Sequence, residues 1–160
     1  MIKLVKVMKE EEHILHNLMQ YYIYDFSQYL SAITLEHDGS YKPFDLTPFW
    51  VNPNLHPFFI KKEDELIGFA LVESASETEP NAIQEFFIIR KYAGKGYGKI
   101  AATQIFSLFP GKWFVTQVER NYPAQAFWRS TISAYTGGNY RERYDQKRRS
   151  IQEFDTNSLS

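Results

Sequence analysis

Cysteine is absent from this chain of 160 residues. Its absence excludes disulfide bonds, thiolate metal sites and a cysteine nucleophile, and it is compatible with a reducing cytoplasm. No segment approaches the roughly 20 apolar residues that a membrane-spanning helix needs. An excess of charge of one sign is also lacking, because 18 Lys and Arg stand against 19 Asp and Glu, for a net charge of −1. We therefore expect a cytoplasmic protein that binds neither nucleic acid nor a membrane.

Aromatic residues, in contrast, are plentiful: 13 Phe, 11 Tyr and 3 Trp make up 17% of the chain. A hydrophobic core takes many of them, and a binding cleft can use the rest. The length predicts one domain, residues 1–160, and no repeat or linker divides the chain. Both a monomer and a homodimer are compatible with the sequence.

Hydrophobic periodicity predicts the order of the secondary-structure elements. The expected strands cover residues 2–7, 58–60, 66–72, 83–89, 113–118, 140–146 and 148–155, and the expected helices begin near residues 10, 99 and 121. The strand Leu66–Val72 is apolar on both faces, so it should be central. Residues 35–57 hold four prolines and should be irregular, with room for one short helix. Strands interleaved with helices in this way predict an α/β domain.

A glycine-rich loop, Gly94-Lys95-Gly96-Tyr97-Gly98, lies between a buried strand and a helix. Glycine permits a positive φ angle and a close approach of the backbone to a ligand, and free N–H groups at a helix start bind phosphate. The loop is not a Walker A motif, because Ala93 stands where the first glycine belongs and Ile100 follows Lys99. Its spacing also differs from the dinucleotide fingerprint. Taken alone, the loop is equally well explained as a tight strand-to-helix turn.

Two further segments give the loop a context. They are the strand Gln84–Ile89 and the helix start Asn121-Tyr122-Pro123-Ala124-Gln125-Ala126-Phe127-Trp128. From Ile83 to Trp128 the chain resembles the GNAT superfamily of acetyl-coenzyme A-dependent N-acyltransferases, whose loop reads R/Q-x-x-G-x-G/A and whose later helix often carries N-x-x-A. The order of elements along nearly the whole chain matches that superfamily as well.

The resemblance implies a single GNAT-like domain with a central, twisted, mostly antiparallel sheet, one parallel strand–helix–strand unit and flanking helices. It implies acetyl-coenzyme A as cofactor, with the strand and the later helix at the pantetheine arm and the loop at the pyrophosphate. The residues expected to bind it are Phe87, Ile88, Ile89, Ala93, Gly94, Lys95, Gly96, Tyr97, Gly98, Lys99, Asn121, Phe127 and Trp128. Asn121 has a second explanation, since Asn two residues before Pro123 is a typical helix N-cap.

Two positions depart from the superfamily pattern. Ala93 stands where the loop usually begins with Arg or Gln, which removes one expected contact to the pyrophosphate. Nearby cations that could replace that contact are Arg90, Lys91 and Lys95. Trp128 stands where many members carry a Tyr proposed to protonate the departing thiolate, and an indole N–H donates hydrogen bonds but is no practical acid.

The implied reaction is the transfer of an acetyl group to a primary amine, which attacks the thioester directly. The attack needs a neutral amine and therefore a base. Glu85 is the candidate base, because it interrupts an apolar strand and partial burial would raise its pKa. A surface ion pair explains Glu85 equally well. Tyr135 is the candidate acid, although packing alone also accounts for it.

The acceptor side in this superfamily is built largely by the first helices and the loop after them. Here 11 of the aromatic residues fall between Tyr21 and Phe59, together with four carboxylates and a single Lys. Aromatic walls with carboxylates suit a small cationic or amino-acid-like amine. The residues expected to bind it are Tyr22, Asp25, Phe26, Tyr29 and Trp50. The helical spacing of Tyr22, Phe26 and Tyr29 is equally typical of residues packed in a core.

Other features have simpler explanations. The four histidines lack metal-ligand spacing, and we expect no metal. Several basic residues lie near the C-terminus: Arg141, Arg143, Lys147, Arg148 and Arg149. We expect them to form the charged surface of the last strands. The alternative is that they contact the 3′-phosphate of the coenzyme. Two other functions remain open: a coenzyme A-binding or sensor domain without catalysis, which Ala93 and Trp128 favour, and an unrelated α/β protein that binds a phosphate ligand.

Overall fold

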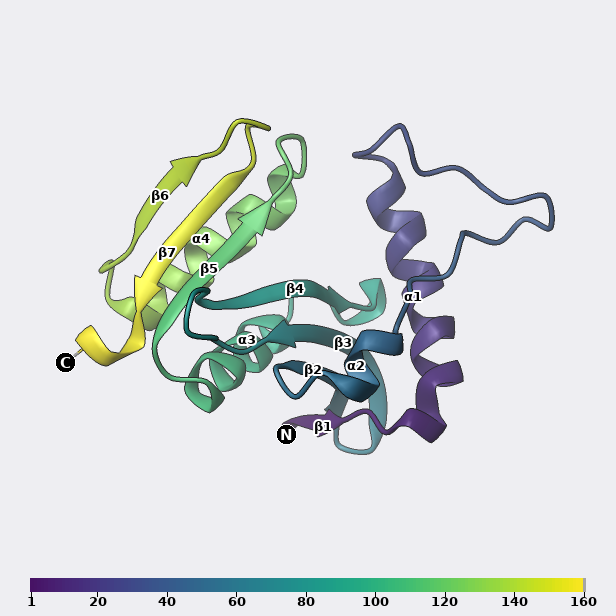
Figure 1. Cartoon of the computed structure of the whole chain (residues 1–160), viewed down its shortest axis with the longest axis horizontal. Coiled ribbons are helices and arrows are strands. Elements are labelled where there is room, and N and C mark those ends of the chain that lie inside the picture. The colour runs from purple at the N-terminus through teal and green to yellow at the C-terminus, as the bar shows by residue number, and fades with distance from the viewer. Residues whose placement is uncertain (160) are drawn as a thin grey trace.

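The computed structural model describes residues 1–159, in which seven strands form one sheet and four α-helices pack against it (Figure 1). The strands are β1 (Ile2–Lys6), β2 (Leu55–Lys62), β3 (Glu65–Glu73), β4 (Asn81–Ile88), β5 (Lys112–Gln117), β6 (Arg141–Tyr144) and β7 (Ser150–Asp155). The α-helices are α1 (Glu12–Ser27), α2 (Thr47–Val51), α3 (Tyr97–Leu108) and α4 (Tyr122–Thr136), and short 3-10 turns cover Lys9–Glu11, Arg90–Tyr92 and Thr156–Ser158. No helix within residues 1–159 is long and apolar enough to cross a membrane.

The order of the strands across the sheet is β1-β2-β3-β4-β5-β7-β6. Every neighbouring pair is antiparallel except β4 and β5, which are parallel and are joined through α3. Parallel strands need a crossover connection of this kind, because the chain must return to the same end of the sheet. The predicted fold class, a mostly antiparallel sheet with one parallel strand–helix–strand unit, is therefore confirmed.

The two parallel strands pair only over a short distance and then separate. Residues Asn81–Ile83 of β4 pair with Trp113–Val115 of β5, and beyond Ile83 the strand β4 continues to Ile88 while it pairs with β3 alone. Figure 1 shows the ribbons of β4 and β5 diverging from that point. The edge of β4 that faces β5 beyond Ile83 therefore carries peptide N–H and C=O groups with no strand partner, which a ligand can use.

Buried side chains fill both faces of the sheet. On one face, side chains of α3 and α4 such as Phe106 pack against the sheet, and on the other face, side chains of α1 and α2 such as Leu15 do so. The central strand β3 contributes to both cores, with Ala70 on the α3/α4 face and Phe69 on the α1/α2 face, each fully buried. The prediction that Leu66–Val72 is a central strand is confirmed, and its lack of polar alternation follows from this double burial.

The long segment before β2 is more ordered than the sequence suggested. It contains α2, and β2 begins at Leu55, earlier than the predicted start at residue 58. The predicted helical face also shortens, because α1 ends at Ser27 and Tyr29 lies beyond it. Tyr22 and Phe26 are half-buried rather than buried, which leaves part of each ring available at the top of the sheet.

Candidate active site

The glycine loop adopts the conformation that its glycines permit. Gly94 and Gly96 have φ angles of 77° and 85°, in the left-handed region where other residues are strained. Gly96 is the N-cap of α3, which starts at Tyr97, two residues earlier than predicted. The first backbone N–H groups of a helix have no partner inside it, and the helix dipole adds positive potential there. The loop thus offers an anion site built from backbone groups.

A second glycine property brings α3 against α4. A Cβ atom on Gly98 would lie 3.1 Å from the ring of Phe127, closer than side chains normally pack. Phe127 and Trp128 of α4 also flank Phe86 of β4, with ring centroids 5.8 and 5.0 Å away. This close packing forms one wall of a cavity between β4, the loop and the N-terminal half of α4.

That cavity, the glycine-loop cleft, has a volume of about 490 Å³. Ten of the thirteen predicted coenzyme residues line it: Phe87, Ile88, Ala93, Gly94, Gly96, Gly98, Lys99, Asn121, Phe127 and Trp128. Three others do not line it: Lys95, Ile89, which packs on the α1/α2 face, and Tyr97, whose ring lies 6.2 Å from that of Tyr92. The cleft thus combines apolar rings, a helix N-terminus and one lysine.

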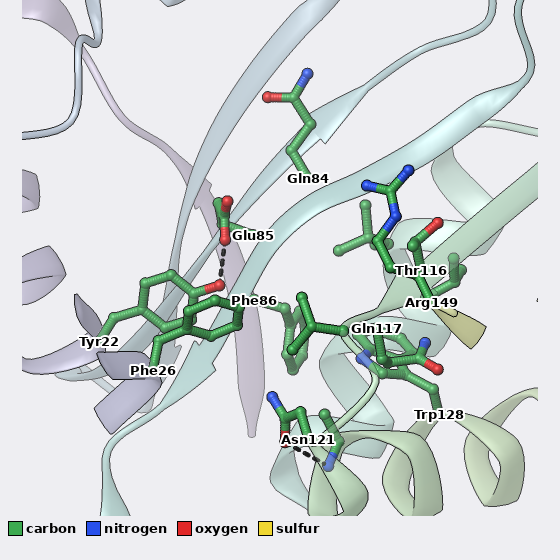
Figure 2. Close-up of a pocket in the computed structure, with 14 residues that line it drawn as sticks. Tyr22, Phe26, Gln84, Glu85, Phe86, Thr116, Gln117, Asn121, Trp128 and Arg149 are labelled. Carbon is green, nitrogen blue, oxygen red and sulfur yellow. Dashed lines mark hydrogen bonds between the residues drawn. The ribbon is translucent and has the colours of Figure 1, made fainter. Parts of the chain in front are cut away.

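A second cavity, the splay pocket, lies where β4 and β5 diverge and has a volume of about 250 Å³. Figure 2 shows its lining, which comes from α1, β4, the end of β5, the start of α4 and the residue before β7. The splay pocket and the glycine-loop cleft share Tyr22, Phe26, Phe86, Asn121, Ala124 and Trp128. The two cavities therefore adjoin at the point of divergence, with residues of α1 and α4 lining both.

Glu85 stands at this junction because of an irregularity in the sheet. The register between β3 and β4 shifts between Leu71 and Val72, so that Gln84 is an extra residue in β4. Such a bulge re-aims the next side chain, and Glu85 turns toward α1, where the Tyr22 hydroxyl donates a hydrogen bond to its carboxylate (Figure 2).

Burial controls the ionisation of this pair. Desolvation raises the pKa of Glu85 from its ordinary 4.5 to about 7, and the Tyr22 hydrogen bond opposes that rise only in part. The pKa of Tyr22 is raised well above its ordinary value, first by burial and then by the charge of Glu85. Tyr22 therefore stays protonated, while Glu85 exchanges a proton near neutral pH.

Asn121 and Trp128 connect the two cavities from the α4 side. The Asn121 side-chain oxygen accepts a hydrogen bond from the Ala124 N–H at 3.1 Å, as an N-cap does, and its amide also lines both cavities. Trp128 is 6% exposed and packs edge-on against Phe86 and Phe127. Asn121 can therefore serve as the N-cap of α4 and as a site residue at the same time.

A family model described as "Acetyltransferase (GNAT) family" matches residues 15–131. The chain belongs to the GNAT acetyltransferase family. It is accordingly an acetyl-coenzyme A-dependent acyltransferase, as the resemblance implied. A search of curated protein sequences gave no significant match.

Solved structures of low sequence identity share the GNAT fold. An acetyltransferase from Thermus thermophilus superposes with a TM-score of 0.68 at 17% identity, covering 95% of this chain and 94% of the other. The PaiA N-acetyltransferase of Thermoplasma acidophilum, solved in complex with coenzyme A, gives 0.65 at 10% identity and covers 97% and 99%. A SpeG spermidine N-acetyltransferase chimera from Vibrio cholerae gives 0.63 at 12% identity and covers 98% and 96%.

The residues of this GNAT protein fit the cofactor. The left-handed glycines and free N–H groups at the start of α3 suit a pyrophosphate, and the unpaired edge of β4 suits an extended arm with amide groups. Ala93, the departure from the GNAT loop, lines the cleft without charge, and Lys99 supplies a cation there. Arg90, one proposed replacement, is instead paired with Asp25 at 2.8 Å. When bound, acetyl-coenzyme A supplies the thioester that donates the acetyl group.

The predicted acceptor residues divide into three groups. Tyr22 and Phe26 line both cavities, whereas Asp25 and Tyr29 line the glycine-loop cleft only. Trp50 lines neither, because its indole N–H donates to Glu12 at 2.6 Å and its ring packs on the α1/α2 face. The structure thus brings only part of this set toward Glu85.

Tyr135, the predicted acid, also lies elsewhere. Its hydroxyl is 3.3 Å from that of Ser107, and its ring packs 5.3 Å from Phe106 on the α3/α4 face. It lines neither the splay pocket nor the glycine-loop cleft. Tyr135 is therefore a packing residue, which is the alternative that the sequence left open.

Nine residues of the splay pocket were not predicted as site residues, and four of them are polar: Gln84, Thr116, Gln117 and Arg149. Arg149 was expected to be strand-surface charge; its side chain is 43% exposed and paired with Asp145, and it also lines the pocket (Figure 2). Gln117 exchanges two hydrogen bonds with Gln152, at 2.6 and 2.9 Å. Nothing local in the sequence marks these residues, because the pocket forms only when β5 and β7 pair beside a diverging β4.

Proposed function

We propose that this GNAT member transfers an acetyl group from acetyl-coenzyme A to the primary amine of a small acceptor seated in the splay pocket. The observation that carries the proposal is the position of Glu85, a carboxylate with a pKa of about 7 that lines the splay pocket and is bonded to Tyr22, a residue of both cavities. Residues 1–160 would act as one N-acetyltransferase domain, since all seven strands of the described residues join one sheet.

Glu85 is suited to accept the proton that an ammonium acceptor must lose before its nitrogen can attack. A base with a pKa near neutrality is ionised in a large fraction, about half, at neutral pH and still binds the proton it removes. The Tyr22 hydroxyl holds the carboxylate in place through its hydrogen bond, and its own raised pKa keeps it a donor. The nitrogen lone pair then forms a bond to the thioester carbon, and the coenzyme thiol leaves with a proton.

Backbone groups and Trp128 complete the chemistry on the other side of the junction. N–H groups on the unpaired edge of β4 are suited to stabilise the negative charge that develops on the carbonyl oxygen. Trp128, in the place of the usual Tyr, can donate a hydrogen bond but cannot supply a proton. We infer that the departing thiolate takes its proton from water or from the amine nitrogen after attack.

The dimensions of the splay pocket support a small acceptor. A volume of about 250 Å³ holds a compact molecule rather than a folded chain. The rings of Tyr22 and Phe26 offer π faces to an ammonium group beside Glu85. An acceptor that is cationic or amino-acid-like at this end fits that environment.

The test is a screen of primary amines with acetyl-coenzyme A, read as free thiol, followed by the Glu85→Gln variant. We expect kcat to fall by about 100-fold or more in Glu85→Gln, because a positioned base contributes about that much. Coenzyme affinity, measured by calorimetry, should not change. Glu79→Gln, which removes an exposed carboxylate in the turn before β4, is the matched control and should retain full activity.

Three results would contradict parts of the proposal. Activity of Glu85→Gln within about twofold of the parent would exclude Glu85 as the base. Silence across the whole panel would exclude a small amine acceptor. If acetyl-coenzyme A still bound in that case, the alternative of a coenzyme-binding domain without catalysis would be favoured.

A further inference from the structure

The splay pocket contains two opposite charges. Among the described residues that line it, Glu85 and Arg149 are the charged ones, and the rest are neutral. Figure 2 shows them on opposite sides of the pocket, Glu85 from β4 and Arg149 from the turn that leads into β7. Arg149 does not line the glycine-loop cleft, so its position offers no contact to the coenzyme phosphates. Asp145 engages the Nε of Arg149, and the other N–H groups of the guanidinium are left for a ligand in the pocket.

The turn before β7 holds Arg149 in a defined orientation. The Asp145 carboxylate accepts hydrogen bonds from the backbone N–H groups of Lys147 and Arg149, at 3.0 and 2.9 Å, and from the Arg149 Nε at 2.6 Å. Arg148 has a φ angle of 58°, in the left-handed region that residues other than glycine rarely adopt. Strain of this kind persists where the surrounding structure fixes it, often at functional sites.

This anchoring leaves the outer end of the guanidinium for a ligand. Asp145 engages Nε, so the two terminal amino groups point away from it as a planar fork. Such a fork matches the two oxygens of a carboxylate with parallel N–H···O bonds. The hydroxyl of Thr116, at the end of β5, lines the same pocket and can add a further donor.

We propose that the acceptor is a zwitterion, a free amino acid or a close analogue, whose carboxylate is held by Arg149 while its amine faces Glu85. The inference rests on the proposed function and specifies its substrate class. Two anchors of opposite charge fix both ends of a small molecule and so orient the amine toward the junction. A polyamine, by contrast, would bring a second positive charge to the side of the pocket that Arg149 occupies.

The experiment compares acceptors that differ only in the carboxylate. Lysine is paired with cadaverine, and phenylalanine with 2-phenylethylamine, and each is assayed with the parent, Arg149→Gln, Arg149→Lys and Lys147→Gln. We expect the parent to prefer the amino acid of a pair that it accepts, and Arg149→Gln to raise KM for that amino acid by about 10- to 100-fold, the usual worth of a charge-assisted hydrogen bond. Arg149→Lys should fall between the two. The KM of the amine without carboxylate should stay within about threefold.

Two controls separate recognition from folding. Lys147→Gln removes a positive charge two residues from Arg149 and should match the parent for every acceptor. Coenzyme A titrated by calorimetry should bind Arg149→Gln as tightly as the parent, which shows that the cleft is intact. Calorimetric titration of the coenzyme A complex with the amino acids gives a binding readout that does not depend on turnover.

The possible failures are distinguishable. If amines without a carboxylate are acetylated as well as amino acids, or if Arg149→Gln affects both series equally, the zwitterion proposal is overturned and the proposed function stands. If no acceptor of either series is acetylated, the proposed function fails, and the titration decides the rest. If amino acids still bind the parent and the Arg149→Gln variant binds them more weakly, Arg149 keeps its proposed role as the carboxylate anchor. If amino acids do not bind the parent, that role is overturned.

Discussion

The two cavities of this protein are lined by different kinds of chemical group. The glycine-loop cleft draws mainly on two nearly continuous stretches, residues 86–99 and 121–131, which include its glycines and the helix N-terminus, and α1 with the turn after it adds four side chains. The splay pocket draws on individual side chains from α1, β4, β5, α4 and the turn before β7. Backbone recognition depends on conformation, which glycine and helix starts encode locally, whereas side-chain recognition depends on which distant residues the fold brings together. The first leaves a motif in the sequence and the second does not.

The same difference matches the chemistry on each side. Acetyl-coenzyme A is the common donor of the family, and a site of peptide groups is suited to bind it without depending on many side-chain identities. The splay pocket, which we propose as the acceptor side, carries the charged groups Glu85 and Arg149, and Glu85 is bonded to Tyr22, which lines both cavities. Substitutions that separate the two halves are therefore the sharpest tests of this comparison.

The largest expected effect concerns the stability of the acceptor side. The folded pKa of Glu85 is raised to about 7, so the protein gains stability from protonated Glu85 below its ordinary pKa of 4.5 and loses it as the pH rises through about 7. Glu85→Gln keeps a neutral side chain at all pH values. At about pH 8 we expect this variant to be more stable than the parent by up to about 3 kcal/mol, measured by urea unfolding.

The gain should disappear when the same unfolding is measured near pH 4.5, where the parent is protonated as well. Glu79→Gln, with an exposed carboxylate, should show no comparable pH dependence. A Glu85→Gln variant that is no more stable than the parent at high pH would mean that the carboxylate is not desolvated, and the contrast between the halves would weaken.

The second effect tests the coenzyme side alone. In Gly98→Val the new side chain meets the Phe127 ring, 3.1 Å from the Cβ position, and must displace α4 or the ring. Overpacking of this kind costs about 1 to 3 kcal/mol, so we expect the Kd for acetyl-coenzyme A to rise by roughly 10-fold or more. The KM of the acceptor should stay constant. Leu108→Val, at an exposed position of the same helix, is the control.

If Gly98→Val changes acceptor KM as strongly as coenzyme Kd, the two cavities are not independent, and the division into halves is wrong. Calorimetry with coenzyme A and steady-state kinetics at saturating coenzyme separate these outcomes.

A smaller effect is expected from Tyr22→Phe, at the contact between the halves. The hydrogen bond from Tyr22 lowers the pKa of Glu85 against the effect of burial, so its loss should raise that pKa further. We expect the midpoint of the pH–rate profile to move upward by roughly one pH unit, the equivalent of about 1.4 kcal/mol. Tyr21→Phe, at the neighbouring exposed position on α1, should leave the profile unchanged. A downward shift would contradict the assignment of donor and acceptor.

The smallest effect on the reaction is expected from Trp50→Phe. Trp50 donates to Glu12 at 2.6 Å and lines neither cavity, so its loss should lower stability by about 1 kcal/mol and leave the acceptor KM unchanged. Unfolding in urea and steady-state kinetics measure the two quantities. A change in acceptor KM of about tenfold would instead place Trp50 in the acceptor site, as its sequence position first indicated.

Much of the fold followed from local patterns, whereas the positions of individual side chains did not. The double burial of β3 and the strand–loop–helix unit around Gly94–Gly98 are visible as an apolar run and as clustered glycines. Trp50 was assigned to the acceptor side from its neighbourhood in the chain, but it packs under α1. Arg149 was assigned to a charged surface because it lies in a basic stretch, but the Asp145 turn directs it into the splay pocket. Composition and spacing describe a residue's neighbours in sequence, whereas these roles depend on neighbours in space.

The sequence by itself determined the glycine loop, the helix start at Asn121, the apolar strand interrupted by Glu85 and the family to which these belong. These features are encoded by the conformational freedom of single residues and by short-range periodicity, which need no knowledge of distant contacts. The tertiary structure decided the rest: the divergence of β4 from β5, the bulge that turns Glu85 toward Tyr22, and the meeting of Glu85 with Arg149 across one pocket. In this last case residues 64 positions apart line one pocket, because β5 lies between β4 and β7 in the folded sheet.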